Sequence, residues 1–293
     1  MAQLFGKVAI VGIGHIGSSL ARVIKRDGLA GQLVALDNTP AHRDKALELG
    51  IVDAVTADVA TAVAGADLVV LATPIGTYPA LAQAMAPHLA QGAIVSDVGS
   101  VKMATLRDVQ PYLPDGVHLV PGHPIAGTEH SGPEAGFAEL FRGRWCILTP
   151  PEGTAAPAIE QVTALWQSAE SQVEIMEAAH HDRVLAITSH LPHLIAYTIV
   201  GTATDLETTL QQEVIKFSAS GFRDFTRIAA SDPVMWRDIF LNNKEAVLDV
   251  LQRFTEDLTA LQRAIRWGEG DKLQDLFTRT RAIRRSIIDA RQA

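Results

Sequence analysis

The sequence predicts an α/β fold in which a doubly wound parallel sheet is followed by an all-α C-terminal domain. Short apolar runs alternate with helix-length amphipathic stretches over residues 1–176, as expected of repeated βαβ units. A Gly-x-Gly-x-x-Gly motif at residues 12–17 follows the first of these runs and opens a helical stretch, which is the context of a Rossmann-type fold. From residue 177 onward the strand signals stop, and apolar residues recur at helical spacing.

The predicted strands are short runs rich in apolar and β-branched residues. Several are continuously apolar, as expected of strands that are buried on both faces of a sheet. We expect strands at 8–11, 33–36, 68–72, 93–96, 118–120 and 146–148, and crossover helices at 16–26, 40–49, 78–89, 101–112 and 155–168.

The composition indicates a globular protein and argues against several kinds of partner. The chain has 293 residues, 47% of them hydrophobic, which is ample material for a core. A formal net charge of −8 makes nucleic acid an unlikely partner. We expect no membrane segment, because apolar stretches such as 194–201 stay below the ~18 residues that a span needs. Cys146 is the single cysteine, and the absence of a leader-like start also fits a reducing cytoplasm.

The shift in composition near residues 170–180 predicts a domain boundary. We expect a dinucleotide-binding domain at 1–176 and a helical domain at 177–293. No Gly/Ser/Pro-rich tract separates the two parts, so a flexible linker is not expected.

The glycine motif indicates a site for the pyrophosphate of a dinucleotide. Gly12 permits the tight turn, Gly14 lets the backbone approach the pyrophosphate, and Gly17 lets the helix pack on the strand. The helix N-terminus then offers unpaired N–H groups to the phosphates. His15 and Ile16 lie inside the motif and are expected beside the cofactor. A purely structural glycine-rich turn is the less favoured alternative.

Asp37 indicates that the dinucleotide is NAD. It ends the next predicted strand, twenty positions after Gly17, where a carboxylate binds the adenosine ribose 2′-hydroxyl and repels a 2′-phosphate. His42 and Arg43 follow closely and soften this preference if they face the ribose. They are as easily explained as the solvated first turn of the next helix.

Polar residues follow three further strands, at the sheet edge where ligands of open α/β sheets bind. Thr73 and Pro74 are expected beside the cofactor. Ser100 is expected near the reacting groups, or as the N-cap of the helix that follows, and both roles are compatible. His123, between a glycine and a proline after the strand at 118–120, is a candidate general base, with an ordinary loop histidine as the alternative.

The helical half contains histidines and arginines of less certain meaning. His190 and His193 lack the spacing of the zinc-protease motif, so we expect no metal. Arg223 and Arg227 are four residues apart and can share a helix face as an anion-binding pair. Pairing with Asp224 and Asp238 is the default alternative.

Taken together, these residues resemble the prephenate/arogenate dehydrogenase family of tyrosine biosynthesis. The resemblance covers nearly the whole chain, and its last three stretches are more specific than the glycine loop. The stretches are GIGHIGSS at 12–19, DVGSVK at 97–102, GHPIAGTEHSG at 122–132, HHDRVLAITSHLPH at 180–193 and GFRDFTRIAASDPVMWRDIF at 221–240.

The resemblance implies a reaction and a set of roles. Such enzymes oxidise the hydroxyl-bearing ring carbon of a cyclohexadienyl acid with NAD⁺, while the ring carboxylate leaves as CO₂. It implies His123 as the base and Ser100 as its hydrogen-bonding partner at the hydroxyl. It implies substrate-binding positions at Arg227, His193, Asp182, Glu129, Arg223 and Trp236. It also implies a homodimer built through the helical domain.

Two other classes of function remain open from the sequence. One is another dehydrogenase of the same architecture, such as a 3-hydroxyacid dehydrogenase or an imine reductase. The other is a non-catalytic NAD sensor, which has no use for His123, Ser100 and Arg227 together. The substrate's side chain, pyruvyl in prephenate or alanyl in arogenate, is not decided by the sequence.

Overall fold

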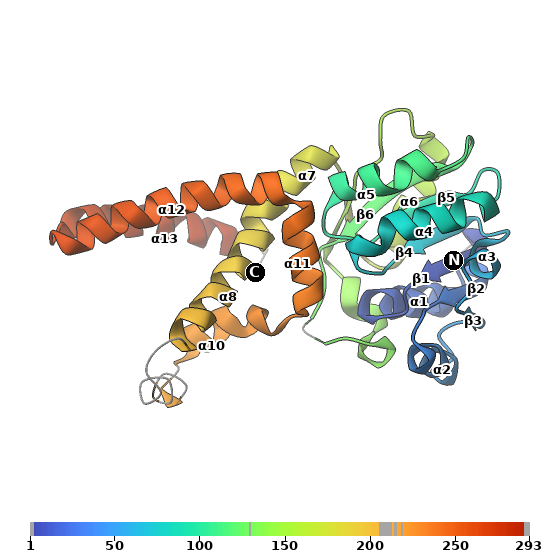
Figure 1. Ribbon diagram of the computed structural model, residues 1–293, viewed down its shortest axis with the longest axis horizontal. Helices are drawn as coiled ribbons and strands as arrows, with labels where there is room; N and C mark the ends of the chain where they lie inside the picture. The colour runs from blue at the N-terminus through green and yellow to red at the C-terminus, as the bar shows by residue number, and fades with distance from the viewer. Residues whose placement is uncertain (1–2, 129, 205–212, 214–215, 218, 290–293) are drawn as a thin grey trace. The chain divides into compact units, whose positions relative to one another are not determined.

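The computed structural model describes residues 3–128, 130–204, 213, 216–217 and 219–289. The chain forms two compact units, residues 1–244 and 245–293, and each is described by itself. The sheet lies in the first unit (Figure 1). The expected boundary at 176/177 rests on composition, and it stays a prediction.

An eight-stranded sheet forms the centre of the first unit. Its strand order is β3-β2-β1-β4-β5-β6-β7-β8, and the first six strands follow the doubly wound order of nucleotide-binding sheets. The strands are β1 (Phe5–Val11), β2 (Ala30–Leu36), β3 (Ala54–Thr56), β4 (Leu68–Leu71), β5 (Ile94–Asp97), β6 (His118–Pro124), β7 (Trp145–Leu148) and β8 (Gln172–Ile175). The predicted fold class is confirmed, with one difference: β7 runs antiparallel to β6.

Helices connect the strands and continue to the end of the first unit. The α-helices are α1 (His15–Asp27), α2 (Pro40–Glu48), α3 (Val59–Val63), α4 (Tyr78–Met85), α5 (Lys102–Val109), α6 (Ala156–Ser168), α7 (Ala178–Leu185), α8 (Leu191–Thr204), α10 (Ser220–Thr226) and α11 (Pro233–Asn242). Short 3₁₀ segments are η1 (Ile75–Thr77), η2 (Ala86–His88), η3 (Gln110–Tyr112), η4 (Pro133–Ala135), η5 (Ala138–Phe141) and η7 (Arg227–Ala230), and η6 (Ala186–His190) is π-helical. The sequence did not reveal β3, β8 or α3, which are only three to five residues long.

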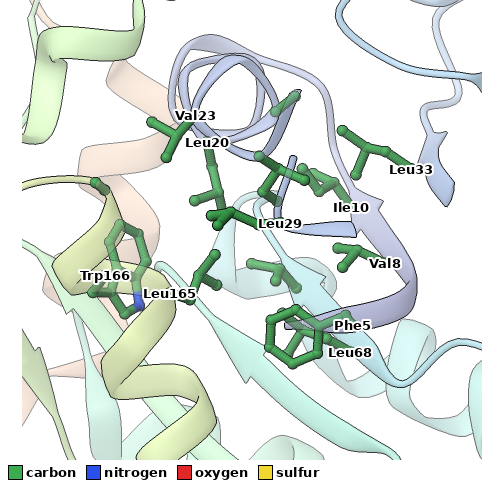
Figure 2. Close-up of a cluster of buried hydrophobic side chains, with 14 of the residues drawn as sticks. Phe5, Val8, Ile10, Leu20, Val23, Leu29, Leu33, Leu68, Leu165 and Trp166 are labelled. Atoms are coloured by element: carbon green, nitrogen blue, oxygen red, sulfur yellow. The ribbon is translucent and has the colours of Figure 1, made fainter. Parts of the chain in front are cut away.

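Two separate hydrophobic clusters cover the two faces of the sheet. On one face, α1 and α6 pack on strand residues such as Val8 and Ile10, with Trp166 of α6 pointing into the cluster (Figure 2). On the other face, α3, α4 and α5 pack on Ala9 and Val11 (Figure 1). Because successive strand residues point to opposite faces, a strand such as β4, buried on both, is apolar along its whole length.

Strand β6 is longer than the sequence predicts, and this changes the position of His123. The expected strand ended at residue 120, which left His123 in a loop. In the structure β6 runs to Pro124, and His123 pairs with Ile147 of the antiparallel strand β7. The added strand supplies the hydrogen-bonding partner that extends β6, so His123 lies on a sheet backbone and not on a free loop.

A single long helix, from α7 through η6 to α8, begins the helical part. Pro192 lies in it, and because proline has no N–H and crowds the carbonyl four residues earlier, the helix widens into a π turn immediately before it. This helix bears on the expectation that no segment spans a membrane. Residues 178–203 are long and apolar enough to cross a bilayer by length and composition alone, although 22% of the apolar window is buried within the protein.

The second unit consists of most of α12 (Lys244–Arg266) and all of α13 (Gly270–Asp289). Both helices are amphipathic, and large apolar side chains on them are exposed. Leu248 on α12 is 55% exposed and Phe277 on α13 is 56% exposed, and Trp267, in the turn between the two helices, is 61% exposed. Exposed apolar surface on this scale is typical of a helix that another chain covers.

Candidate active site

The glycine loop is shaped for a phosphate group. Gly12 has a φ of +96°, and a Cβ there would lie 2.7 Å from Ala72 O. A Cβ on Gly17 would overlap Gly12 O, whereas a Cβ on Gly14 would meet nothing within 4 Å. The N-terminus of α1 has no side-chain cap and no acidic residue in its first turn. Gly14 and the first turn, which includes Ile16, therefore form an open cradle of the kind that accepts a pyrophosphate.

Asp37 is held beside this loop. Its Oδ2 accepts from Ile13 N at 3.0 Å, and its Oδ1 accepts from Thr39 N at 2.8 Å. His42 Nδ1 is 3.4 Å from Oδ2, and Arg43 Nη1 donates to the main-chain oxygen of Asp37 at 2.6 Å. His42 and Arg43 thus face Asp37 and are not simply solvated.

His15 is buried under a segment that folds back over the start of α1. Its Nε2 lies 3.4 Å from Thr128 Oγ1, and its ring centroid is 6.2 Å from that of Phe137. Phe137 N donates to Ser19 Oγ at 3.2 Å. Burial lowers the pKa of His15 from 6.5, so the ring beside the phosphate cradle is neutral at pH 7.

The ends of β4 and β5 bring further predicted residues to the same edge of the sheet. Thr73 follows β4, and its Cγ2 would lie 2.7 Å from a Cβ on Gly12. Pro74 is exposed at the start of η1. Ser100 follows β5 and is half-buried.

Ser100 does not cap α5, contrary to one of its two expected roles. The N-cap residue is Val101, and it has no capping side chain. The cap comes from α7, because Asp182 Oδ1 accepts from Lys102 N at 2.7 Å and its Oδ2 accepts from Met103 N at 2.9 Å. Ser100 is therefore not engaged at the helix terminus.

A buried ion pair fixes the backbone next to His123. Lys102 and Asp97 are both fully buried, and Lys102 Nζ lies 2.6 Å from Asp97 Oδ2. Lys102 Nζ also donates to Gly122 O at 2.6 Å, while Gly122 N donates to Asp97 Oδ1 at 3.2 Å. Tyr78 Oη and Thr105 Oγ1 both donate to Asp97 Oδ2. A charge pair whose lone pairs are satisfied in this way is tolerated in a core, and it holds both main-chain groups of Gly122.

His123 lies at the end of β6 and is joined to α7. Its Nδ1 is 2.9 Å from His181 Nε2, and His181 Nδ1 is 2.8 Å from Asp182 Oδ1. The three residues are 8%, 0% and 3% exposed. Asp182, which was expected among the substrate-binding positions as the residue that orients the polar network, uses both oxygens to hold α5 and His181.

Burial keeps both rings of the histidine pair neutral near pH 7. It lowers the pKa of His123 well below 6.5, and His181 and the Lys102 ammonium lower it further. Burial also lowers the pKa of His181, against the hydrogen bond to Asp182. A neutral imidazole is the form that accepts a proton.

His193 and Trp236 form a second group on α8 and α11. Their rings stack with centroids 3.7 Å apart, and His193 Nδ1 donates to Ser189 O at 2.9 Å, inside the π turn. Burial lowers the pKa of His193, against the hydrogen bond to Ser189 O, and the charge of Arg227 lowers it further. Asp232 caps α11 by accepting from Met235 N at 2.8 Å.

One predicted residue is not brought to these groups, and two unpredicted ones are. Arg223 is exposed on α10, and Glu129 lies outside the described residues. His181 and Lys102 were not expected at the site. Their only sequence signals are the adjacency of His181 to Asp182 and a lysine at the start of a predicted crossover helix.

The fold and these groups define a class of protein: a nicotinamide-nucleotide dehydrogenase with a helical second part. Two family profiles agree with this class. One, described as the nucleotide-binding domain of prephenate dehydrogenase, matches residues 20–175, and the other, described as its dimerization domain, matches residues 177–279. The chain belongs to the prephenate dehydrogenase family.

Individual relatives support the same assignment. A cyclohexadienyl dehydrogenase of Zymomonas mobilis is 42% identical over 97% of both chains. The crystal structure of a prephenate dehydrogenase from Aquifex aeolicus with hydroxyphenyl propionate and NAD⁺ matches with a TM-score of 0.89 and 36% identity, over 96% of this chain and 98% of that one. A Synechocystis arogenate dehydrogenase structure matches with a TM-score of 0.80 and 27% identity, over 96% and 99%. The two alternative classes of function are therefore set aside.

Proposed function

We propose that the protein catalyses the NAD-dependent oxidative decarboxylation of prephenate to 4-hydroxyphenylpyruvate, of arogenate to tyrosine, or of both. The observation that carries this proposal is the neutral, buried His123 at the carboxyl edge of the sheet, next to the strand ends that follow the nucleotide loop. The relatives named above include enzymes described for each substrate, and the ring chemistry is the same for both.

His123 is the proposed general base. Its ring takes the proton from the substrate's ring hydroxyl as a carbonyl forms at that carbon. The bound nicotinamide supplies the acceptor for the hydride that leaves the same carbon. The C–C bond to the ring carboxylate then breaks and CO₂ leaves; the bonding electrons make the ring aromatic, and the former carbonyl oxygen takes the proton back from His123 and becomes the phenol hydroxyl. Ser100, which does not cap α5, makes a hydrogen bond with the same substrate hydroxyl and holds it toward His123.

The remaining predicted residues are proposed to hold the substrate. Arg227 pairs with a substrate carboxylate, because a guanidinium offers two parallel N–H donors to it. His193 and Trp236 contact the substrate as one stacked unit. Asp182 does not contact the substrate itself but positions His181 and the start of α5. Arg223 and Glu129 are proposed as pocket residues on the sequence resemblance alone.

The residues at the nucleotide loop fit NAD. We propose that Gly12, Gly14, His15, Ile16 and Gly17 surround the pyrophosphate, because Gly14 leaves open space beside the uncapped N-terminus of α1. Asp37 receives the ribose 2′-hydroxyl, and Thr73 and Pro74 border the nicotinamide half. Asp37 favours NAD over NADP, because its carboxylate repels a 2′-phosphate.

We propose that two copies of the chain associate through residues 177–293, with residues 1–176 binding the nucleotide. The dimerization-domain match and the exposed apolar residues of α12 and α13 support this assembly. A second copy, and not lipid, then covers the apolar helix at 178–203. A cytoplasmic enzyme with a small-molecule substrate and no nucleic-acid partner fits this description.

The test is turnover by the wild-type protein and by His123→Asn. We expect reduced cofactor to form from prephenate, arogenate or both with NAD⁺, and His123→Asn to lower kcat by about 10²–10⁴-fold, as is typical when a positioned base is lost. NAD⁺ affinity, measured by calorimetry, stays unchanged because the phosphates bind elsewhere. His88→Asn, an exposed histidine in η2, is the control. A His123→Asn variant with more than half of the wild-type kcat contradicts the assignment.

A further inference from the structure

His181 stands between the proposed base and a fixed carboxylate. Its two ring nitrogens face opposite partners, with Nε2 2.9 Å from His123 Nδ1 and Nδ1 2.8 Å from Asp182 Oδ1. His181 is 0% exposed, so its proton arrangement is set by these neighbours and not by water.

The hydrogen-bonding partners determine which nitrogen carries each proton. Asp182 accepts the main-chain N–H groups of Lys102 and Met103, so its carboxylate acts as an acceptor and the proton of His181 lies on Nδ1. A neutral imidazole has one N–H, which leaves a lone pair on His181 Nε2. His123 Nδ1 must then carry the proton that this lone pair accepts. The remaining nitrogen of His123, Nε2, has no proton.

We propose that His181 is a positioning residue that holds His123 in the tautomer whose Nε2 is free to accept a proton. The proposal deepens the proposed function, in which His123 takes the proton of the substrate hydroxyl. Free histidine in water favours the opposite tautomer, with its proton on Nε2, and the hydrogen bond at one ring nitrogen decides the state of the other. Without His181 the base nitrogen would be blocked in most molecules.

The backbone supports this arrangement. Lys102 and Asp97 hold the main-chain oxygen and nitrogen of Gly122, the residue before His123, so the ring of His123 is placed from the sheet side. Asp182 holds His181 from the α7 side while it caps α5. When His123 takes up a proton, its Nδ1–H keeps the same acceptor and no group has to turn.

Two amide substitutions separate the two hydrogen bonds of His181. The amide of glutamine reaches about as far as a histidine Nε2, and the amide of asparagine about as far as Nδ1. His181→Gln therefore keeps an oxygen that accepts from His123, whereas His181→Asn keeps only the group that faces Asp182. His181→Phe removes both. His180→Asn, at the exposed neighbour on the same helix, is the matched control.

The kinetic result should follow the bond to His123. We expect His181→Phe and His181→Asn to lower kcat by about 10²-fold or more, as when a base loses the group that orients it, with KM for substrate and NAD⁺ within about threefold. His181→Gln should retain kcat within about tenfold, and His180→Asn should match the wild type. Equal loss of kcat in folded His181→Gln and His181→Asn would overturn the proposal, because a merely structural ring does not distinguish the two amides.

The tautomer itself can be read without substrate. Ring ¹⁵N chemical shifts of histidine-labelled protein distinguish a protonated from a bare nitrogen, and the His123 signals are those that His123→Asn removes. We expect Nδ1 of His123 to be protonated in the wild type and Nε2 to be protonated in most molecules of His181→Phe. A wild-type His123 with its proton on Nε2 would overturn the proposal. Lack of turnover with both substrates would instead contradict the proposed function, and the ¹⁵N result would still decide the role of His181.

Discussion

Asp37 is fixed in place before any cofactor binds. Main-chain N–H groups of Ile13 and Thr39 donate to its two oxygens, so the carboxylate needs no rearrangement to meet a ribose. Arg43 lies close but donates to the main-chain oxygen of Asp37. In this position the guanidinium supports the strand end and is not directed to a phosphate.

Asp37→Ser should shift the choice of cofactor. Removing the carboxylate relieves its repulsion of a 2′-phosphate and leaves Arg43 nearby, so the ratio of kcat/KM for NADP⁺ over NAD⁺ should rise by about tenfold or more, equivalent to roughly 1.4 kcal/mol. Asp44→Ser removes an exposed acid of α2 and should leave the ratio unchanged. A wild-type enzyme that uses both cofactors equally would contradict this interpretation of Asp37.

Residues whose role depends on near neighbours in sequence were predictable, and residues whose role depends on distant ones were not. Gly12 and Gly17 act within six positions of each other, so the motif alone predicts their packing. His181 meets a histidine 58 positions away. Only its adjacency to Asp182 distinguishes it locally from the exposed His180.

At the scale of elements, helix α11 places Trp236 against His193, and its start is fixed by one side chain. Asp232 accepts from Met235 N and precedes Pro233, the arrangement expected of a helix start. For α5 the sequence prediction was wrong in part, because Asp182 on α7 supplies the cap that Ser100 was expected to provide.

Asp232→Ala should affect both stability and substrate binding. Loss of an N-cap destabilises a protein by about 1 kcal/mol, and loosening of α11 also disturbs the Trp236–His193 stack, so KM for the substrate should rise. Asp58→Ala removes the N-cap of α3, which accepts from Thr61 N, and is the matched control. It should lose similar stability, measured by urea unfolding, with no change in KM. An increase in KM that is equal in both variants would show that α11 has no special part in binding.

The extension of β6 and the π turn show where element prediction fails. The run at 118–120 contains Leu119 and Val120, which favour a strand, but Gly122 and Pro124 are poor strand formers, and only pairing with β7 makes them part of the sheet. Pro192 indicates a helix break, yet the widened turn at η6 keeps the helix continuous. In both cases a tertiary partner or a local change of helix type overrides the sequence preference.

At the scale of the whole molecule, the first unit should be sensitive to mild acid. Burial lowers the pKa of His15, His123, His181, His190 and His193 from 6.5, that of His190 to about 4. Below pH 6.5 the unfolded chain therefore binds protons that the folded chain does not, and stability falls as the pH falls. For His190 alone the loss reaches about 3 kcal/mol by pH 4. Carboxylates whose pKa is lowered in the folded chain, such as Asp53, add to this loss of stability only when the pH falls below the ordinary aspartate pKa of 3.8.

Urea unfolding at one protein concentration should reveal this loss of stability between pH 7 and pH 5. We expect the free energy of unfolding to fall with a slope that corresponds to uptake of more than two protons per chain. His190→Asn should reduce that uptake by about one proton, whereas His180→Asn should have little effect. A free energy of unfolding that is flat over this range would contradict the burial of these rings in solution.

Asp182 joins two parts of the chain whose separation can be followed by amide hydrogen exchange. The first-turn amides of a helix usually have no partner within the helix and exchange quickly, but those of Lys102 and Met103 donate to a carboxylate from α7. Their protection therefore reports how often α7 moves away from the sheet. Because His181 lies on the same helix as Asp182, each such opening also takes His181 away from His123, so the exchange rate of these two amides reports the fraction of time that the proposed base lacks its positioning partner.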